Sequence, residues 1–147
     1  MRRFLTYTSI PSLLIGCLLL WRGIHDVWFI DETRVQWEGQ TLPQRWKETL
    51  LWVHLGMQVS IGTGLWASAF WRPLRPYALG GATLLFAMYT VYSELALLER
   101  LPRKPCACIG WWEGSTWPWL VGANALLFLI TVTLIIKTVS ERRGAMT

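Results

Sequence analysis

Four long apolar runs constrain the fold of this chain more than any other feature of its sequence. They cover residues 8–30, 49–71, 76–98 and 116–136. At about 1.5 Å per helical residue, each run can cross a hydrocarbon layer of about 30 Å. Lipid cannot satisfy free backbone groups, and the runs lack the alternation of polar and apolar residues found in barrel strands. The sequence therefore predicts one all-α domain over residues 1–147, a four-helix transmembrane bundle.

Composition and charge favour lipid as the solvent. The chain is 53% hydrophobic, contains 11 Trp and is only 16% charged, so a soluble domain of this size would have too few polar residues to cover its surface. The net charge is +5, but the Lys and Arg residues sit at the ends of apolar runs rather than along one face. We therefore expect membrane lipid, and not nucleic acid, as the partner of these charges.

The distribution of basic residues sets the expected topology. Four spans put both termini on one side of the membrane. That side holds Arg2, Arg3, Arg72, Arg75, Lys137, Arg142 and Arg143, and the opposite side holds Arg34, Arg45, Lys47, Arg100, Arg103 and Lys104. Because basic residues favour the cytoplasmic side, this narrow excess predicts a bacterial-type inner membrane protein with cytoplasmic termini. Loops 31–48 and 99–115 would then lie outside.

The strongest chemical signal is a pair of cysteines one residue apart, Cys106 and Cys108, in loop 99–115. A disulfide needs Cα atoms within about 7 Å, which this spacing meets only with a turned and strained backbone, so the bond would be easy to reduce. Its neighbours are Arg103, Lys104, Pro105 and Gly110. The basic residues favour thiolate over thiol. The proline stiffens the backbone before the pair, and the glycine gives it conformational freedom after the pair. These features predict a dithiol that exchanges.

Two alternatives to thiol exchange use the same cysteines. A copper or zinc site would need further ligands, and His25 and His54 lie in or near other spans, so no metal site is predicted. The cysteines could also be unreactive. Either alternative corresponds to a non-catalytic membrane subunit or assembly factor, in contrast to a thiol-disulfide oxidoreductase component.

The third cysteine, Cys17, follows a sequence that loosely fits a lipoprotein cleavage site. Lipoproteins normally continue with polar residues after that site, whereas residues 18–21 here are Leu-Leu-Leu-Trp. We therefore expect Cys17 to be a small buried apolar residue.

Polar residues inside the apolar runs are candidates for function because charge is costly at membrane depth. The ionisable ones are Arg22, His25, Asp26, His54 and Glu94. Pairing between helices, such as Arg22 with Glu94, is the simpler interpretation. We also expect Asn124 to bond to a neighbouring helix, and glycines to permit close helix packing at Gly62, Gly64, Gly80, Gly81 and Gly122.

The stretch from Tyr89 to Ile136 resembles the MauE and DoxX group of redox-associated membrane proteins. The matching features are Tyr89, Tyr92, Pro105, Cys106, Cys108, Gly110, Trp117 and Asn124. Many relatives have a histidine three residues after the tryptophan, where this chain has Leu120, so no role of that histidine carries over. The resemblance implies a DoxX-like four-helix membrane protein tied to disulfide handling. The prototype is associated with maturation of methylamine dehydrogenase, a disulfide-rich periplasmic enzyme.

Together these patterns predict that Cys106 and Cys108 cycle between dithiol and disulfide with an extracytoplasmic partner or client protein through a mixed disulfide. The sequence contains no second cysteine pair that could complete a relay across the membrane. A partner, or a small electron carrier in the bundle, is then needed. No cofactor is required by the sequence. Tyr89 and Tyr92 are compatible with a quinone pocket, as in unrelated membrane disulfide oxidases, although core packing is the simpler explanation.

Overall fold

The structure, a computed structural model, describes residues 9–40, 42–100 and 117–144, and these are helical apart from short connecting turns. The helices are α1 (Ser9–Trp28), α2 (Ile30–Glu38), α3 (Gln44–Ala67), the short 3-10 helix η1 (Arg72–Leu74), α4 (Arg75–Leu97) and α5 (Trp117–Gly144). These residues include no strand. The all-α class expected from the apolar runs is confirmed.

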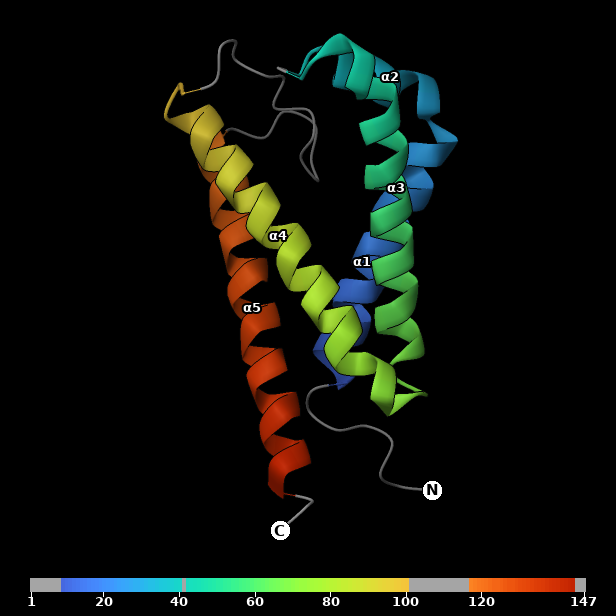
Figure 1. Cartoon of the computed structure of the whole chain (residues 1–147), viewed down its shortest axis with the longest axis vertical. Coiled ribbons are helices and arrows are strands. Elements are labelled where there is room, and N and C mark those ends of the chain that lie inside the picture. The colour runs from blue at the N-terminus through green and yellow to red at the C-terminus, as the bar shows by residue number, and fades with distance from the viewer. Residues whose placement is uncertain (1–8, 41, 101–116, 145–147) are drawn as a thin grey trace.

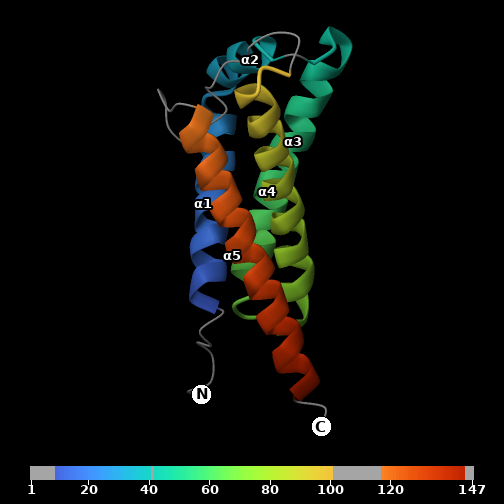
Figure 2. The same cartoon turned by 90° about the vertical axis from the view of Figure 1, so that its left-hand side faces the viewer.

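The four long helices run along the length of the molecule, and α2 lies across one end, which we call the α2 end (Figures 1 and 2). α1 packs mainly on α3, and α4 packs mainly on α5. The two pairs are close where α4 begins and diverge towards the α2 end (Figure 1). α1 begins and α5 ends at the opposite end, whereas α4 ends and α5 begins at the α2 end.

The helix bounds differ from the expected spans by more than one residue in four places, one of which is the end of α3 at Ala67, before the expected end at residue 71. α1 ends at Trp28, before the expected end at residue 30, and the mostly polar residues Ile30–Glu38 form the separate helix α2. α3 begins at Gln44, ahead of the expected start at residue 49, and α5 continues to Gly144, past residue 136. In both cases the helix extends into polar sequence, because a helix satisfies its own backbone groups in water as well as in lipid.

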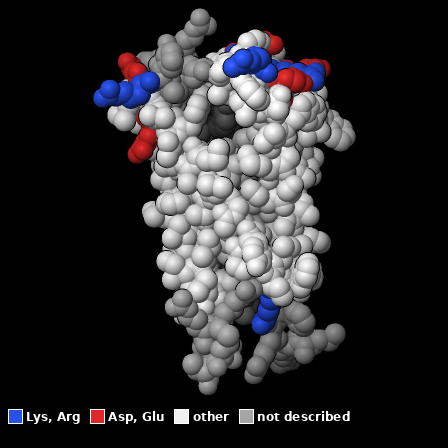
Figure 3. Space-filling model, viewed as in Figure 1, with Lys and Arg blue, Asp and Glu red and all other residues white. Residues whose placement is uncertain are grey.

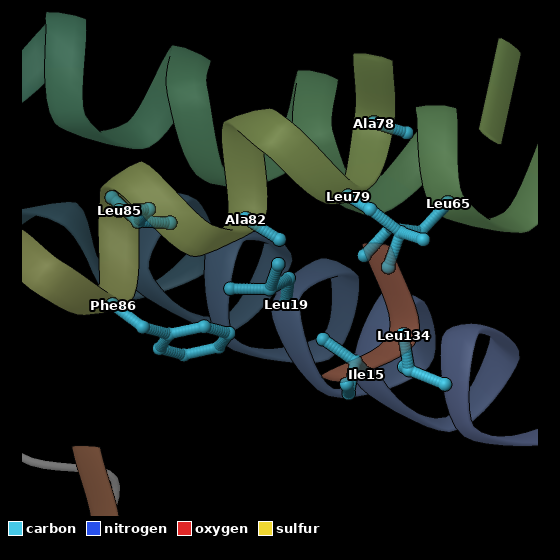
Figure 4. Packing of buried hydrophobic residues seen from close by; sticks show 9 residues of the cluster. All are labelled: Ile15, Leu19, Leu65, Ala78, Leu79, Ala82, Leu85, Phe86 and Leu134. Carbon is cyan, nitrogen blue, oxygen red and sulfur yellow. The ribbon is translucent and has the colours of Figure 1, made fainter. Parts of the chain in front are cut away.

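A hydrophobic core joins all four long helices. It comprises Ile15, Leu19, Leu65, Ala78, Leu79, Ala82, Leu85, Phe86 and Leu134. Figure 4 shows Leu19 of α1 beside Ala82 and Phe86 of α4, with Leu134 of α5 near Ile15. Because α1, α3, α4 and α5 all contribute, this core fixes the two helix pairs against each other.

The surface between the two ends is apolar. Large apolar side chains such as Leu14, Leu84, Leu126 and Leu129 are exposed. On the face in Figure 3, Lys, Arg, Asp and Glu gather at the ends of the molecule and leave the middle uncharged. A soluble monomer rarely exposes so extensive an apolar surface, whereas lipid covers it without cost.

Two helices meet the length and hydropathy required for a membrane span, over Ile10–Trp28 and Pro118–Glu141. α3 and α4 are of similar length to α1, but α3 starts with a polar turn that contains Arg45, Lys47 and Glu48. Membrane character is thus supported by the first and last long helices. The crossing of the membrane by α3 and α4 remains a prediction.

Cys17 is exposed on α1, so the expectation of a buried residue is wrong. It lies on the outward face of the helix together with Leu14, Leu18 and Trp21, which are also exposed. Residues three and four apart share one face of a helix, and this face points away from the core. A small thiol among apolar side chains suits a lipid-facing surface.

Glycine permits the closest contact between α1 and α3. A Cβ atom added to Gly62 would lie 2.9 Å from the backbone nitrogen of Leu20, and one added to Gly16 would lie 3.1 Å from the carbonyl oxygen of Gly62. The expected packing role is therefore confirmed at Gly62. It is not supported at Gly80 and Gly122, where an added Cβ would meet no atom of the described residues within 4 Å.

Replacing Gly62 with alanine is expected to lower the free energy of unfolding by about 1–3 kcal/mol, because the backbone of α1 must move to admit the methyl group. Gly56→Ala is the matched control on the same helix, since an added Cβ there has no neighbour within 4 Å. Unfolding of the purified protein in detergent, followed by circular dichroism, measures both. Equal stability of the two variants would contradict the close contact.

Candidate functional site

The cysteine pair predicted to carry the chemistry lies outside the described residues. The same holds for its supporting neighbours Arg103, Lys104, Pro105 and Gly110. The side chain of Trp117, the first residue of α5, is also not described. The helices that flank segment 101–116 are described, and the end of α4 and the start of α5 both lie at the α2 end (Figures 1 and 2). The polar residues at this end are therefore the described surroundings of the candidate site.

An ion pair with a buried carboxylate lies near the end of α1. The Nη2 atom of Arg22 lies 2.9 Å from Oδ1 of Asp26, and its Nε atom donates a hydrogen bond of 3.1 Å to Oδ2. The two-pronged contact satisfies both carboxylate oxygens. His25 is adjacent, with Nδ1 at 3.8 Å from Oδ1 of Asp26. The hydroxyl of Thr33 donates to the backbone oxygen of Asp26 at 3.1 Å, which ties α2 to this turn of α1.

The expected pairing of Arg22 with Glu94 is wrong. Arg22 pairs within its own helix, because Asp26 is four residues later and lies on the same face. Glu94 is exposed on α4. The ionisable residues near the end of the first span therefore form a local pair instead of a bridge between helices.

His54, Tyr89 and Gln58 form a second polar group, between α3 and α4. The amide nitrogen of Gln58 donates to the hydroxyl of Tyr89 at 3.1 Å. The same hydroxyl lies 3.2 Å from Nε2 of His54. The ring of Trp37, from α2, also packs against His54, with ring centroids 5.3 Å apart. Of the predicted polar residues, His54 is thus the one that the fold brings together with Tyr89.

Further hydrogen bonds extend this group along α4. The hydroxyl of Tyr92 donates to the side-chain oxygen of Gln40, which links α4 to the segment after α2. The hydroxyl of Ser93 donates to the backbone oxygen of Tyr89 at 2.6 Å and accepts a bond of 3.3 Å from the amide of Asn124 on α5. The expected bond from Asn124 to a neighbouring helix is confirmed.

A charged contact holds α2 over the start of α3. The Nη2 atom of Arg34 lies 2.9 Å from Oε1 of Glu48, and the indole of Trp52 donates to the same oxygen at 2.9 Å. The hydrogen bond from Trp52, together with that from Arg34, holds the pKa of the Glu48 carboxyl below its ordinary value. This pair is exposed, in contrast to Arg22 and Asp26.

Two cavities meet at His54 and Tyr89. The larger, of about 220 Å³, lies between α3, α4 and the segment after α2 and is lined by Trp37, Gln40, Leu42, Leu50, His54, Leu85, Met88, Tyr89 and Tyr92. Figure 3 shows a hollow on this face, below the charged residues at the α2 end. The smaller, of about 10 Å³, is lined by Arg22, Asp26, Thr33, Gln36, Trp37, His54, Gln58 and Tyr89.

Several residues of this cluster were not predicted from the sequence, namely Thr33, Gln36, Trp37, Gln40 and Gln58. Gln58 offered a usable signal, because it is an amide in the middle of an apolar run. Neutral polar side chains in lipid also need partners, so a search confined to ionisable residues omits it. The α2 residues gave no such signal, since polar residues are ordinary in a loop.

No group of three or more His, Cys, Asp or Glu side chains that could hold a metal ion is present in residues 9–40, 42–100 and 117–144. The cluster is suited to hydrogen bonding and proton exchange: it combines an imidazole, a phenol and a carboxylate with its guanidinium partner. These groups sit at the end of the molecule where α4 and α5 meet the segment that contains the cysteines.

The uncharged apolar middle of the surface (Figure 3) and the two described helices able to span a membrane define the class: a helical membrane protein, here with a cluster of polar side chains towards the α2 end. The chain belongs to the family of methylamine utilisation protein MauE, whose family model matches residues 4–137. The resemblance inferred from the cysteine motif is thereby confirmed, and the chain is a member of a membrane-protein family associated with methylamine utilisation. No curated protein and no solved structure matches it.

Proposed function

We propose that the protein is a membrane-embedded thiol-disulfide redox component that supports disulfide formation or maturation of extracytoplasmic proteins. Cys106 and Cys108 are the exchanging pair. The observation that carries the proposal is the Pro-Cys-Ala-Cys-Ile-Gly sequence at 105–110 in a chain of the MauE family. A short loop with two thiols and adjacent basic residues favours a reactive thiolate over a structural bond.

The exchange step involves only sulfur atoms and protons. One thiolate of the pair attacks a disulfide of the partner, the partner's S–S bond breaks, and a mixed disulfide forms while the released sulfur takes up a proton. The second cysteine then attacks the mixed disulfide. The products are a Cys106–Cys108 disulfide and a reduced partner, and the reverse sequence oxidises the partner. We assign the first attack to Cys106, because it lies nearer Lys104.

The proposal includes four membrane spans, formed by α1, α3, α4 and α5, with the α2 end and segment 101–116 outside. Three observations support this arrangement: the uncharged middle of the surface, the location of α4's end and α5's start at one end, and the excess of basic residues with the termini. It would expose Cys106 and Cys108 to extracytoplasmic proteins.

Thiol labelling in intact cells tests this arrangement. A membrane-impermeant maleimide should label Cys106 and Cys108 only after mild reduction if the pair is a disulfide, or directly if it is a dithiol. In either case a reductant or oxidant added outside the cell should change the labelled fraction. Cys17 gives the internal reference, since it lies within the apolar surface of α1.

Two outcomes would contradict the proposal. Labelling that never responds to reductant or oxidant would favour a non-catalytic membrane subunit with structural or metal-binding cysteines. Labelling that occurs only after lysis would reverse the topology. A variant with serine at both positions should show no labelling beyond that of Cys17.

A further inference from the structure

The cavity of about 220 Å³ between α3 and α4 has no part in the exchange of sulfur atoms described above. Its lining has two distinct regions. Leu50, Leu85 and Met88 make one side apolar, and His54 and Tyr89 present an imidazole and a phenol on another. Binding sites for small molecules combine apolar walls with a few convergent polar groups in this way.

The polar side of the cavity continues into the interior. His54 and Tyr89 also line the smaller cavity, together with Arg22 and Asp26. Its volume of about 10 Å³ corresponds to a single water molecule. The side-chain oxygen of Gln58, a residue only 3% exposed, has no hydrogen-bond partner among the described residues and lines the same space. Hydrogen-bonding groups therefore run from the larger cavity to the carboxylate of Asp26.

The apolar side faces the surroundings of the bundle. Met88 lines the cavity and is 54% exposed, so this side of the cavity reaches the apolar surface of the molecule. A ligand could thus enter from lipid and keep an apolar tail among lipid chains. An acyl chain would use the leucines but would leave the imidazole and phenol without a role.

We propose that this cavity binds the head group of a lipid-soluble quinone. A quinone ring is flat and apolar and carries two carbonyl oxygens that accept hydrogen bonds, so it uses both sides of the lining. Tyr89 and His54 both line this space, and because their hydroxyl and ring nitrogen lie 3.2 Å apart, one of them can donate to the other while the other donates to a carbonyl oxygen. The rings of Trp37 and Tyr92 line the same space and supply flat surfaces for stacking. Binding involves no cysteine.

Titration of the purified full chain in detergent micelles tests the proposal, with decylubiquinone and menadione as probes and decane as the apolar control. Isothermal titration calorimetry should show saturable binding of at least one quinone and none of decane. Tyr89→Phe, which removes a single hydroxyl, should weaken binding about three- to tenfold. Leu50→Trp, which fills the cavity, should abolish it.

Matched variants separate the site from general effects. Tyr77→Phe on α4 and Leu129→Trp on α5 change exposed residues by the same chemistry and should bind as the unaltered chain does. Replacement of Cys106 and Cys108 by serine should also leave binding unchanged, so loss of thiol exchange and loss of quinone binding are distinguishable. Binding that neither Tyr89→Phe nor Leu50→Trp weakens, or that decane matches, would overturn the proposal. So would the absence of binding by both quinones.

Discussion

Replacing Arg22 with alanine is expected to lower the free energy of unfolding by about 3–5 kcal/mol at neutral pH, the typical cost of leaving one member of a buried ion pair without its partner. The side chain of Asp26 is only 6% exposed, and Arg22 satisfies both of its carboxylate oxygens. His25, at 3.8 Å, is too far away to replace the two lost hydrogen bonds.

The protein contains a matched control for this prediction. Arg34 and Glu48 are separated by the same 2.9 Å, but their side chains are 44% and 58% exposed. Arg34→Ala should therefore cost less than about 1 kcal/mol. In the double variant Arg22→Ala/Asp26→Asn, the buried charge is absent, and most of the lost stability should return. Chemical unfolding in detergent measures all three variants. A loss for Arg22→Ala no larger than that for Arg34→Ala would show that the burial of Asp26 has no energetic consequence.

The sequence predicted the long helices because their evidence is local. An apolar run of about 20 residues must be helical in lipid, whatever its neighbours are. α2 was not predicted, because Ile30–Glu38 is short and mostly polar. Such a helix is stabilised by contacts with other helices, which the local sequence does not indicate. Those contacts include the bond from Thr33 to Asp26 and the pair of Arg34 with Glu48.

The partner of a polar residue was harder to predict than the importance of the residue itself. His54 and Asp26 stand out in the sequence because ionisable groups are costly in lipid. Whether Arg22 pairs with Asp26 or with Glu94 depends on which faces of α1 and α4 meet. Sequence spacing alone identifies only the possible partner four residues away in the same helix. The approach of His54 to Tyr89 depends likewise on the crossing of α3 and α4. The two cavities are lined by residues of several helices that are far apart in the sequence, and no local pattern indicates such a lining.

The second large effect is expected when one cysteine of the pair is replaced. It concerns a mixed disulfide with the partner, which either accumulates or does not form. Replacing Cys108 with serine removes the thiol that resolves the mixed disulfide, so the adduct of Cys106 with its partner should accumulate. Cys106→Ser should not form that adduct, because the attacking thiol is missing. Cys17→Ser is the matched control, since it removes a single cysteine remote in sequence from the pair and should behave as the unaltered chain does.

Capture of this adduct is the most direct test of thiol exchange. Cells that express each variant are quenched with acid, their free thiols are alkylated, and membranes are separated on a gel without reductant. Thiol exchange by the pair predicts a larger, reductant-sensitive species that contains the chain and a partner protein. It should be strong in Cys108→Ser and absent when serine replaces both Cys106 and Cys108. If no single-cysteine variant forms such a species, or if the species persists when both cysteines are replaced, the pair does not exchange with a partner.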